Sequence, residues 1–295
     1  MSAGAPPRTV QLPGVAGLAL TADRWAAPDG QPVVLLHGGG QTRHAWGETG
    51  ATLAGLGYDV TSLDLRGHGD SAWAADGDYR MDAFRDDLRA VLAGLSQPAV
   101  LIGASLGGVA ALLAAGEAPA SDVRAVVLVD ITPEAEPEGI ARIQAFMTAN
   151  TDGFADVEAA AEAVAGYLPH RPRAPNPRGL MKNLRERGGR LYWHWDPSFL
   201  AVTAADRNAD GGRLERAARA LSVPTLLVRG SDSDIVSPRA AEGFLRLVPH
   251  AQMVEVAGAA HMVAGDQNTA FGTALTGFLQ RNAPALPIDR RLSQA

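Results

Sequence analysis

The chain has 295 residues, of which 46% are hydrophobic and 20% charged, and it contains no cysteine. The missing thiols exclude a disulfide scaffold, a cysteine nucleophile and a cysteine-ligated metal, and they make the cytoplasm the expected compartment. A formal net charge of -6 and the lack of a basic cluster argue against nucleic-acid binding. No run of about 18 apolar residues predicts a membrane span, and residues 1–8 lack the apolar core of a signal peptide.

Predicted strands and helices alternate along most of the chain. Short apolar or alternating runs predict strands at 9–12, 18–25, 32–36, 58–65, 99–102, 125–129, 223–228 and 253–256. Amphipathic or alanine- and leucine-rich segments predict helices at 45–56, 82–95, 109–115, 241–248 and 271–279. This alternation predicts an α/β fold with a doubly wound, mostly parallel sheet of about eight strands, whose first two strands form an antiparallel edge hairpin.

The strand pattern stops between residues 133 and 221. Helical segments replace it at 138–149, 156–167, 178–187 and 212–220. We predict that residues 133–221 form a helical cap, inserted into a core of residues 1–132 and 222–282 and followed by a poorly packed tail at 283–295. An aromatic group within the cap either faces a pocket or packs the cap onto the sheet; it consists of Tyr192-Trp193-His194-Trp195.

A single serine stands between glycines where an apolar strand turns into a helix. The segment Gly103-Ala104-Ser105-Leu106-Gly107 is a Gly-x-Ser-x-Gly motif, in which the turn exposes the serine hydroxyl. Side chains two residues before and after the serine would collide with the neighbouring backbone, and glycine avoids that collision. The pattern predicts Ser105 as a nucleophile.

A serine hydroxyl needs a base to accept its proton, and the base needs a group to orient it. In open parallel sheets the loops that follow the strands converge on one crevice. His261 follows the last predicted strand and is the expected base. Asp234 is the first choice for the acid, with Asp232 and Asp130 as alternatives. The other histidines organise their own loops or lack a position after a strand: His37, His44, His68, His170, His194 and His250.

Acyl transfer also requires amide donors for the negative charge that develops on the attacked carbonyl oxygen. The N–H of Leu106 lies at a predicted helix N-terminus, where the helix dipole favours an anion. The loop His37-Gly38-Gly39-Gly40 supplies the second donor, which we expect to be Gly39, with Gly38 or Gly40 as alternatives. No nucleotide-binding glycine pattern accompanies this loop.

Between about residues 9 and 281 the sequence resembles the capped α/β-hydrolase superfamily. The motifs that carry the resemblance are the His37-Gly38 loop, Arg66-Gly67-His68-Gly69-Asp70-Ser71, the elbow at Ser105, the acidic loop after Gly230 and the His261 loop. The family commonly has Gly-x-x-Asp in the acidic loop, whereas here the third residue after Gly230 is Ser233. Because Asp-Ile-Val-Ser-Pro resembles the family's usual continuation after its acid, the resemblance favours Asp234.

The resemblance implies a serine hydrolase that acts on a carboxylic ester or a lactone. Carbon-carbon bond hydrolases of diketones and perhydrolases use the same triad, and some members are non-catalytic small-molecule receptors. We expect no cofactor and no metal, and a small, apolar substrate; the oligomeric state is open. The residues expected to contact substrate are Gly38, Gly40, Trp193, Trp195 and Met262.

Overall fold

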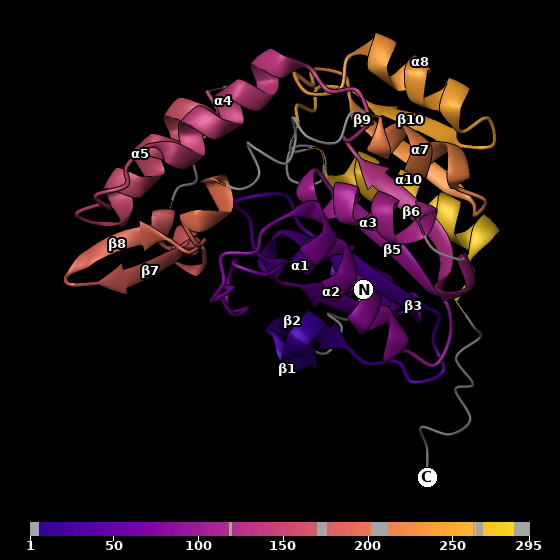
Figure 1. Ribbon diagram of the computed structural model, residues 1–295, viewed down its shortest axis with the longest axis horizontal. Coiled ribbons are helices and arrows are strands. Elements are labelled where there is room, and N and C mark those ends of the chain that lie inside the picture. The colour runs from indigo at the N-terminus through magenta and orange to yellow at the C-terminus, as the bar shows by residue number, and fades with distance from the viewer. Residues whose placement is uncertain are drawn as a thin grey trace.

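The centre of the protein is a sheet with the strand order β1-β2-β4-β3-β5-β6-β9-β10 (Figure 1). The computed structural model describes residues 6–117, 120–169, 176–201, 212–261, 263 and 268–285. The strands are β1 (Arg8–Pro13), β2 (Ala19–Trp25), β3 (Pro32–Leu36), β4 (Asp59–Leu63), β5 (Ala99–Ala104), β6 (Val123–Val129), β9 (Thr225–Gly230) and β10 (Gln252–Val256). The pairs β1–β2 and β2–β4 are antiparallel and every other pair is parallel, so the predicted doubly wound, mostly parallel sheet is confirmed.

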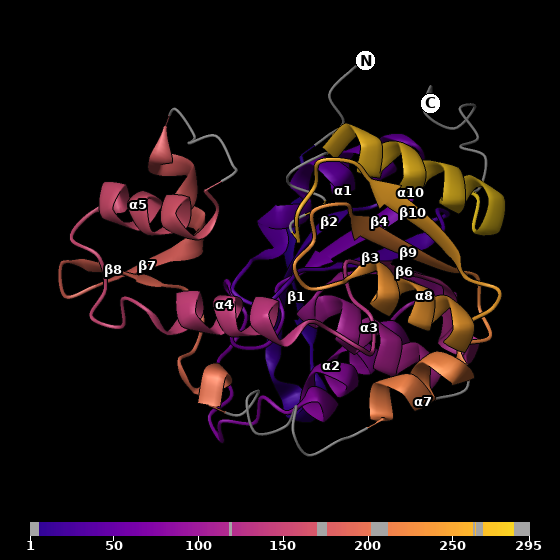
Figure 2. The same cartoon turned by 90° about the horizontal axis from the view of Figure 1, so that it is seen from above.

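Helices cover both faces of this sheet (Figure 2). One face carries α1 (Gly47–Gly55) and α10 (Asn268–Asn282); the other carries α2 (Met81–Ala93), α3 (Leu106–Gly116), α7 (Arg213–Ala220) and α8 (Pro238–Leu247). Successive side chains of a strand point to opposite faces. Val33 and Leu35 of β3 therefore join the core under α10, while Val34 and Leu36 join the core under α3. Two buried faces explain the continuous apolar run in this strand.

A separate lobe stands at one end of the sheet, at the left of Figure 1. It contains α4 (Pro137–Thr148), α5 (Val157–Tyr167), the 3-10 helix η4 (Pro177–Asn183) and a hairpin of β7 (Leu184–Arg187) and β8 (Arg190–Trp193). The prediction of one helix over 178–187 is therefore wrong from residue 184 on, where β7 begins, whereas residues 177–183 form η4. Gly188 and Gly189 both have positive φ, 60° and 74°. Two consecutive residues of this kind form the tight turn of a hairpin, a signal that the sequence analysis overlooked.

The last helix of the predicted insertion, α7, packs on the core and not in the lobe. Gly116 of α3 lies so close to Ala217 of α7 that a side chain at Gly116 would clash with the Ala217 carbonyl group. Arg213 of α7 also forms ion pairs with Glu117 (2.5 Å) and Asp82 (2.6 Å). The lobe is thus shorter than the predicted cap at 133–221. Part of the predicted tail, residues 286–295, lies outside the described residues.

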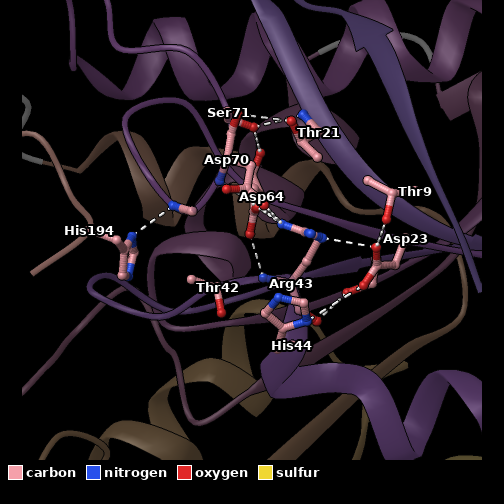
Figure 3. A network of polar contacts seen from close by, with 12 residues as sticks. Thr9, Thr21, Asp23, Thr42, Arg43, His44, Asp64, Asp70, Ser71 and His194 are labelled. Carbon is pink, nitrogen blue, oxygen red and sulfur yellow. Dashed lines mark hydrogen bonds and ion pairs between the residues drawn. The ribbon is translucent and has the colours of Figure 1, made fainter. Parts of the chain in front are cut away.

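A buried ion cluster fixes the loops beside β4 (Figure 3). The Arg43 guanidinium lies 2.5 Å from Asp64 Oδ2, 2.8 Å from Asp70 Oδ2 and 2.9 Å from Asp23 Oδ1. Asp64 is fully buried and also accepts the backbone N–H groups of Arg43 (2.6 Å) and Asp70 (2.9 Å). The Asp70 side chain is exposed, but a buried ion pair that loses one partner leaves an uncompensated charge, so the pair of Arg43 and Asp64, with the Asp70 N–H bound to it, holds the loop of Asp70 in one position.

Three buried histidines lie in a row next to the cluster, and the middle one, His68, belongs to the loop of Asp70. The His37 and His68 ring centroids are 5.2 Å apart, and those of His68 and His194 are 5.7 Å apart. His37 Nδ1–H donates to the Gly38 carbonyl (2.8 Å), as the prediction of a loop-organising role implied. Burial lowers the pKa of His37 to about 4 and that of His68 to about 3, and it also lowers the pKa of His194. The folded protein therefore keeps all three imidazoles neutral at pH 7.

None of the helices in the described ranges is long and apolar enough to cross a membrane.

The three neutral histidines predict that the protein loses stability in mild acid. In the unfolded chain each histidine binds a proton near pH 6.5, whereas in the folded protein it does so only at lower pH. The unfolded state then binds more protons, so the free energy of unfolding falls as the pH drops from 7.5 to 5, by about 2 kcal/mol for each such histidine. Urea denaturation at both pH values measures this loss.

The variant His68→Gln has one titrating group fewer in this row. We expect it to be less stable than the parent at pH 7.5 but to lose about 2 kcal/mol less on going to pH 5. Equal pH dependence of the two proteins would contradict the neutral, buried state of His68.

Candidate active site

Ser105 lies at the sharp turn between β5 and α3. Its backbone has φ 46° and ψ -115°, a conformation that residues with a side chain adopt rarely and at a cost in energy. A Cβ at Gly107 would lie 2.5 Å from the Leu36 carbonyl oxygen, and one at Gly103 would overlap the carbonyl group of Gly107. The predicted strand–turn–helix geometry is therefore present, and it depends on both glycines.

The glycine loop after β3 lies directly beside this serine. A Cβ at Gly38 would lie 3.4 Å from the Cβ of Ser105, and the Gly107 N–H donates to the His37 carbonyl (3.1 Å). The glycine loop and the turn at Ser105 are thus joined by a backbone hydrogen bond. Backbone amides of the loop are within reach of a group bound at Ser105.

Two backbone amides next to Ser105 are free to donate. Within the described residues, the N–H groups of Gly39 and Leu106 have no hydrogen-bond partner. The Gly38 N–H, in contrast, donates to Gln41 Oε1 (2.9 Å). This arrangement favours Gly39 over Gly38 as the second donor of an oxyanion hole.

His261 contacts Asp130, which was the last of the three predicted acids. The distance from His261 Nδ1 to Asp130 Oδ2 is 2.8 Å. Asp130 is fully buried at the end of β6, and its carboxylate also accepts the Ser233 hydroxyl (2.5 Å) and the Gly230 N–H (3.2 Å). The preference for Asp234 as the partner of His261 is therefore corrected to Asp130.

The other two candidate acids have different partners. Asp234 Oδ2 lies 2.8 Å from Arg142 Nη1 of α4, and Asp232 accepts the hydroxyl of its neighbour Ser231 (2.9 Å). Ser233 stands three residues after Gly230, where the family commonly has its acid. Its hydroxyl donates a hydrogen bond to Asp130. The absence of an aspartate at that position was the signal that could have pointed to Asp130 as the partner of His261.

An apolar wall covers the glycine loop; Met147, Trp195 and Phe199 contact the loop, and Trp193 packs against Trp195. A Cβ at Gly40 would lie 3.2 Å from Met147 and 3.3 Å from Trp195, and one at Gly39 would lie 3.7 Å from Phe199. Trp193 and Trp195 stack with ring centroids 5.1 Å apart and an interplanar angle of 12°. Met147 and Phe199 could not be predicted from the sequence, because nothing in their local sequence separates a wall residue from a core residue.

Two further predictions concern substrate contact and metal binding. Met262, the fifth predicted substrate contact, lies outside the described residues. Within the part of the chain that the structure describes, no group of three or more histidine, aspartate or glutamate side chains is placed to hold a metal ion.

Comparisons with known proteins identify the family of this chain. An esterase of Mycobacterium tuberculosis is 33% identical over 276 residues, which cover 88% of this chain and 86% of the relative. A non-heme chloroperoxidase of Burkholderia pyrrocinia is 32% identical over 225 residues, covering 72% of this chain and 78% of the relative. The crystal structure of E-2-(acetamidomethylene)succinate hydrolase matches with a TM-score of 0.81 at 26% identity, over 93% of this chain and 99% of that one. Residues 31–266 match the model of the alpha/beta hydrolase fold, and the chain therefore belongs to that family.

Proposed function

We propose that this protein is a serine hydrolase that cleaves a carboxylic ester or a lactone through an acyl-enzyme on Ser105. The observation that carries the proposal is the 2.8 Å hydrogen bond between His261 Nδ1 and the buried Asp130. An imidazole held in this way directs its Nε2 lone pair away from the carboxylate, where it accepts a proton from a serine hydroxyl. The esterase relative at 33% identity supports the same class of reaction.

Each step of the proposed reaction uses a group of this site. Ser105 Oγ attacks the carbonyl carbon while His261 Nε2 accepts the hydroxyl proton, and Asp130 stabilises the resulting imidazolium. The Gly39 and Leu106 amides donate to the negatively charged oxygen, which the positive end of α3 also favours. The imidazolium then protonates the leaving alcohol. Water then gives a proton to His261 and attacks the acyl-enzyme. As the bond between the acyl carbon and Ser105 Oγ breaks, His261 returns the proton to Ser105 Oγ and the acid leaves.

The apolar wall supports a hydrophobic acyl group as the preferred substrate. Trp195 and Phe199 both lie against the glycine loop that would hold the oxyanion, so apolar side chains stand next to the attacked carbonyl. An acyl chain attached to the attacked carbonyl would extend along this wall. Removal of the acyl chain's apolar surface from water would contribute to substrate binding.

A second candidate reaction is perhydrolysis, which the non-heme chloroperoxidase relative favours. Hydrogen peroxide would then replace water in the attack on the acyl-enzyme, and a peracid would leave. Side-by-side assays with an activated ester, a lactone and a vinylogous diketone, each with and without peroxide, separate hydrolysis from perhydrolysis and from carbon-carbon cleavage.

Removal of the Ser105 hydroxyl should abolish turnover. We expect the variant Ser105→Ala to lose at least about 10³-fold in kcat on an activated ester and to form no adduct with a fluorophosphonate probe, because both need the nucleophile. Mass spectrometry should locate the wild-type adduct on Ser105. A wild-type protein that neither labels nor turns over esters would instead favour a non-catalytic receptor.

The choice of acid gives a matched pair of variants. We expect Asp130→Asn to lower kcat by about 10³- to 10⁴-fold, because an amide next to Nδ1 favours the wrong imidazole tautomer. Asp234→Asn removes the same charge but leaves His261 in place, so we expect kcat within about fivefold of the wild-type value. Steady-state kinetics on one ester substrate compares the two, and a larger loss in Asp234→Asn would overturn the assignment.

A further inference from the structure

A short segment after β8 fastens the lobe to two loops of the core. The Asp196 N–H donates to the Gly67 carbonyl (2.9 Å), and Asp196 Oδ2 accepts the Tyr79 hydroxyl (2.6 Å). Trp195 packs against Gly40. The segment therefore touches both the loop after β4 and the glycine loop after β3.

His194, the first residue of this segment, bridges the same two loops with its side chain. Its Nδ1 accepts the Gly69 N–H (2.7 Å), and its Nε2 lies 3.2 Å from the Gly40 carbonyl oxygen. A backbone N–H only donates and a carbonyl only accepts, so Nδ1 carries the lone pair and Nε2 carries the proton. The side chain is 1% exposed, and burial lowers its pKa, which keeps this neutral tautomer.

The position of the Gly40 carbonyl affects the orientation of the preceding residue, Gly39. Gly39, whose amide is the proposed oxyanion donor, has no side chain to anchor its peptide planes, and neither has Gly40. The bond from the Gln41 N–H to the Gly38 carbonyl (3.1 Å) closes the loop from within. The bond from His194 holds it from the side of the lobe.

We propose that His194 is a positioning residue, which fixes the aim of the Gly39 amide by holding the Gly40 carbonyl from the lobe. The inference rests on the proposed function above. The strength of an oxyanion donor depends on its direction toward the transition-state oxygen. The effect of His194 should thus appear in kcat and not in substrate binding, and the oxyanion hole is complete only when the lobe is seated.

Two variants of His194 separate its two hydrogen bonds. The amide oxygen of asparagine occupies the position of Nδ1 and accepts the Gly69 N–H, but the side chain is too short to reach Gly40. The amide nitrogen of glutamine occupies the position of Nε2 and donates to the Gly40 carbonyl. We expect His194→Asn to lower kcat about tenfold or more with KM within about twofold, and His194→Gln to stay within about threefold of the wild-type kcat.

The affinity for a transition-state analogue distinguishes a positioning role of His194 from a purely structural one. We expect the inhibition constant of a trifluoromethyl ketone to rise in His194→Asn by the same factor by which kcat falls, while that of the carboxylic acid product stays unchanged. Thr42→Val is the matched control, since it removes another hydrogen bond between core and lobe, from Thr42 Oγ1 to Asn183 Oδ1 (3.1 Å). Its kcat should be within about twofold of the wild-type value.

The outcomes distinguish this inference from the proposed function. A wild-type protein without fluorophosphonate labelling at Ser105 overturns both. A labelled, active wild type with an unchanged kcat in His194→Asn overturns the role of His194 alone. A folded His194→Gln that loses tenfold or more in kcat also overturns it, and this result decides the matter even where His194→Asn does not fold.

Discussion

The hydrogen bond between His261 and Asp130 is the contact on which the proposed chemistry depends. A carboxylate away from water needs donors, and Asp130, at 0% exposure, receives them from Ser233, the Gly230 amide and His261. These donors lie at the end of β9 and in the loops after β9 and β10. Since β6 lies between β5 and β9, the acid follows the strand next to the one that leads to Ser105. The sheet order thus brings together residues that are far apart in the chain.

Because the proposed acid Asp130 follows β6, the aspartates of the loop after β9 are available for other contacts. Asp234 in that loop pairs with Arg142 of α4 at 2.8 Å, and Gly139 of the same helix packs against the Asp234 backbone. At the other end of the lobe, His194 contacts the glycine loop. The lobe is therefore held to the core at both of its connections. We infer that its seating and the assembly of the oxyanion hole are linked.

Much of the fold was predictable because apolar runs such as 32–36 are long enough to mark buried strands. The hairpin around Gly188-Gly189 was missed because charged residues on exposed strands look like a helix surface. Asp234 was preferred because the motif Asp-Ile-Val-Ser-Pro was given more weight than the presence of Ser233 where the family commonly has its acid. His194 could not be predicted, since its partner Gly40 lies 154 residues away and only the folded chain brings the two together. The cytoplasmic location stays a prediction.

The most direct test of the acid assignment is the proton on His261 Nδ1. In the protein without bound substrate, proton NMR of wild type and of Asp234→Ala should show a strongly deshielded signal, which the loss of the signal in His261→Gln assigns to His261. The account predicts that Asp130→Ala removes the signal, because the carboxylate that accepts this proton is gone. A signal that persists in Asp130→Ala and disappears in Asp234→Ala would contradict it.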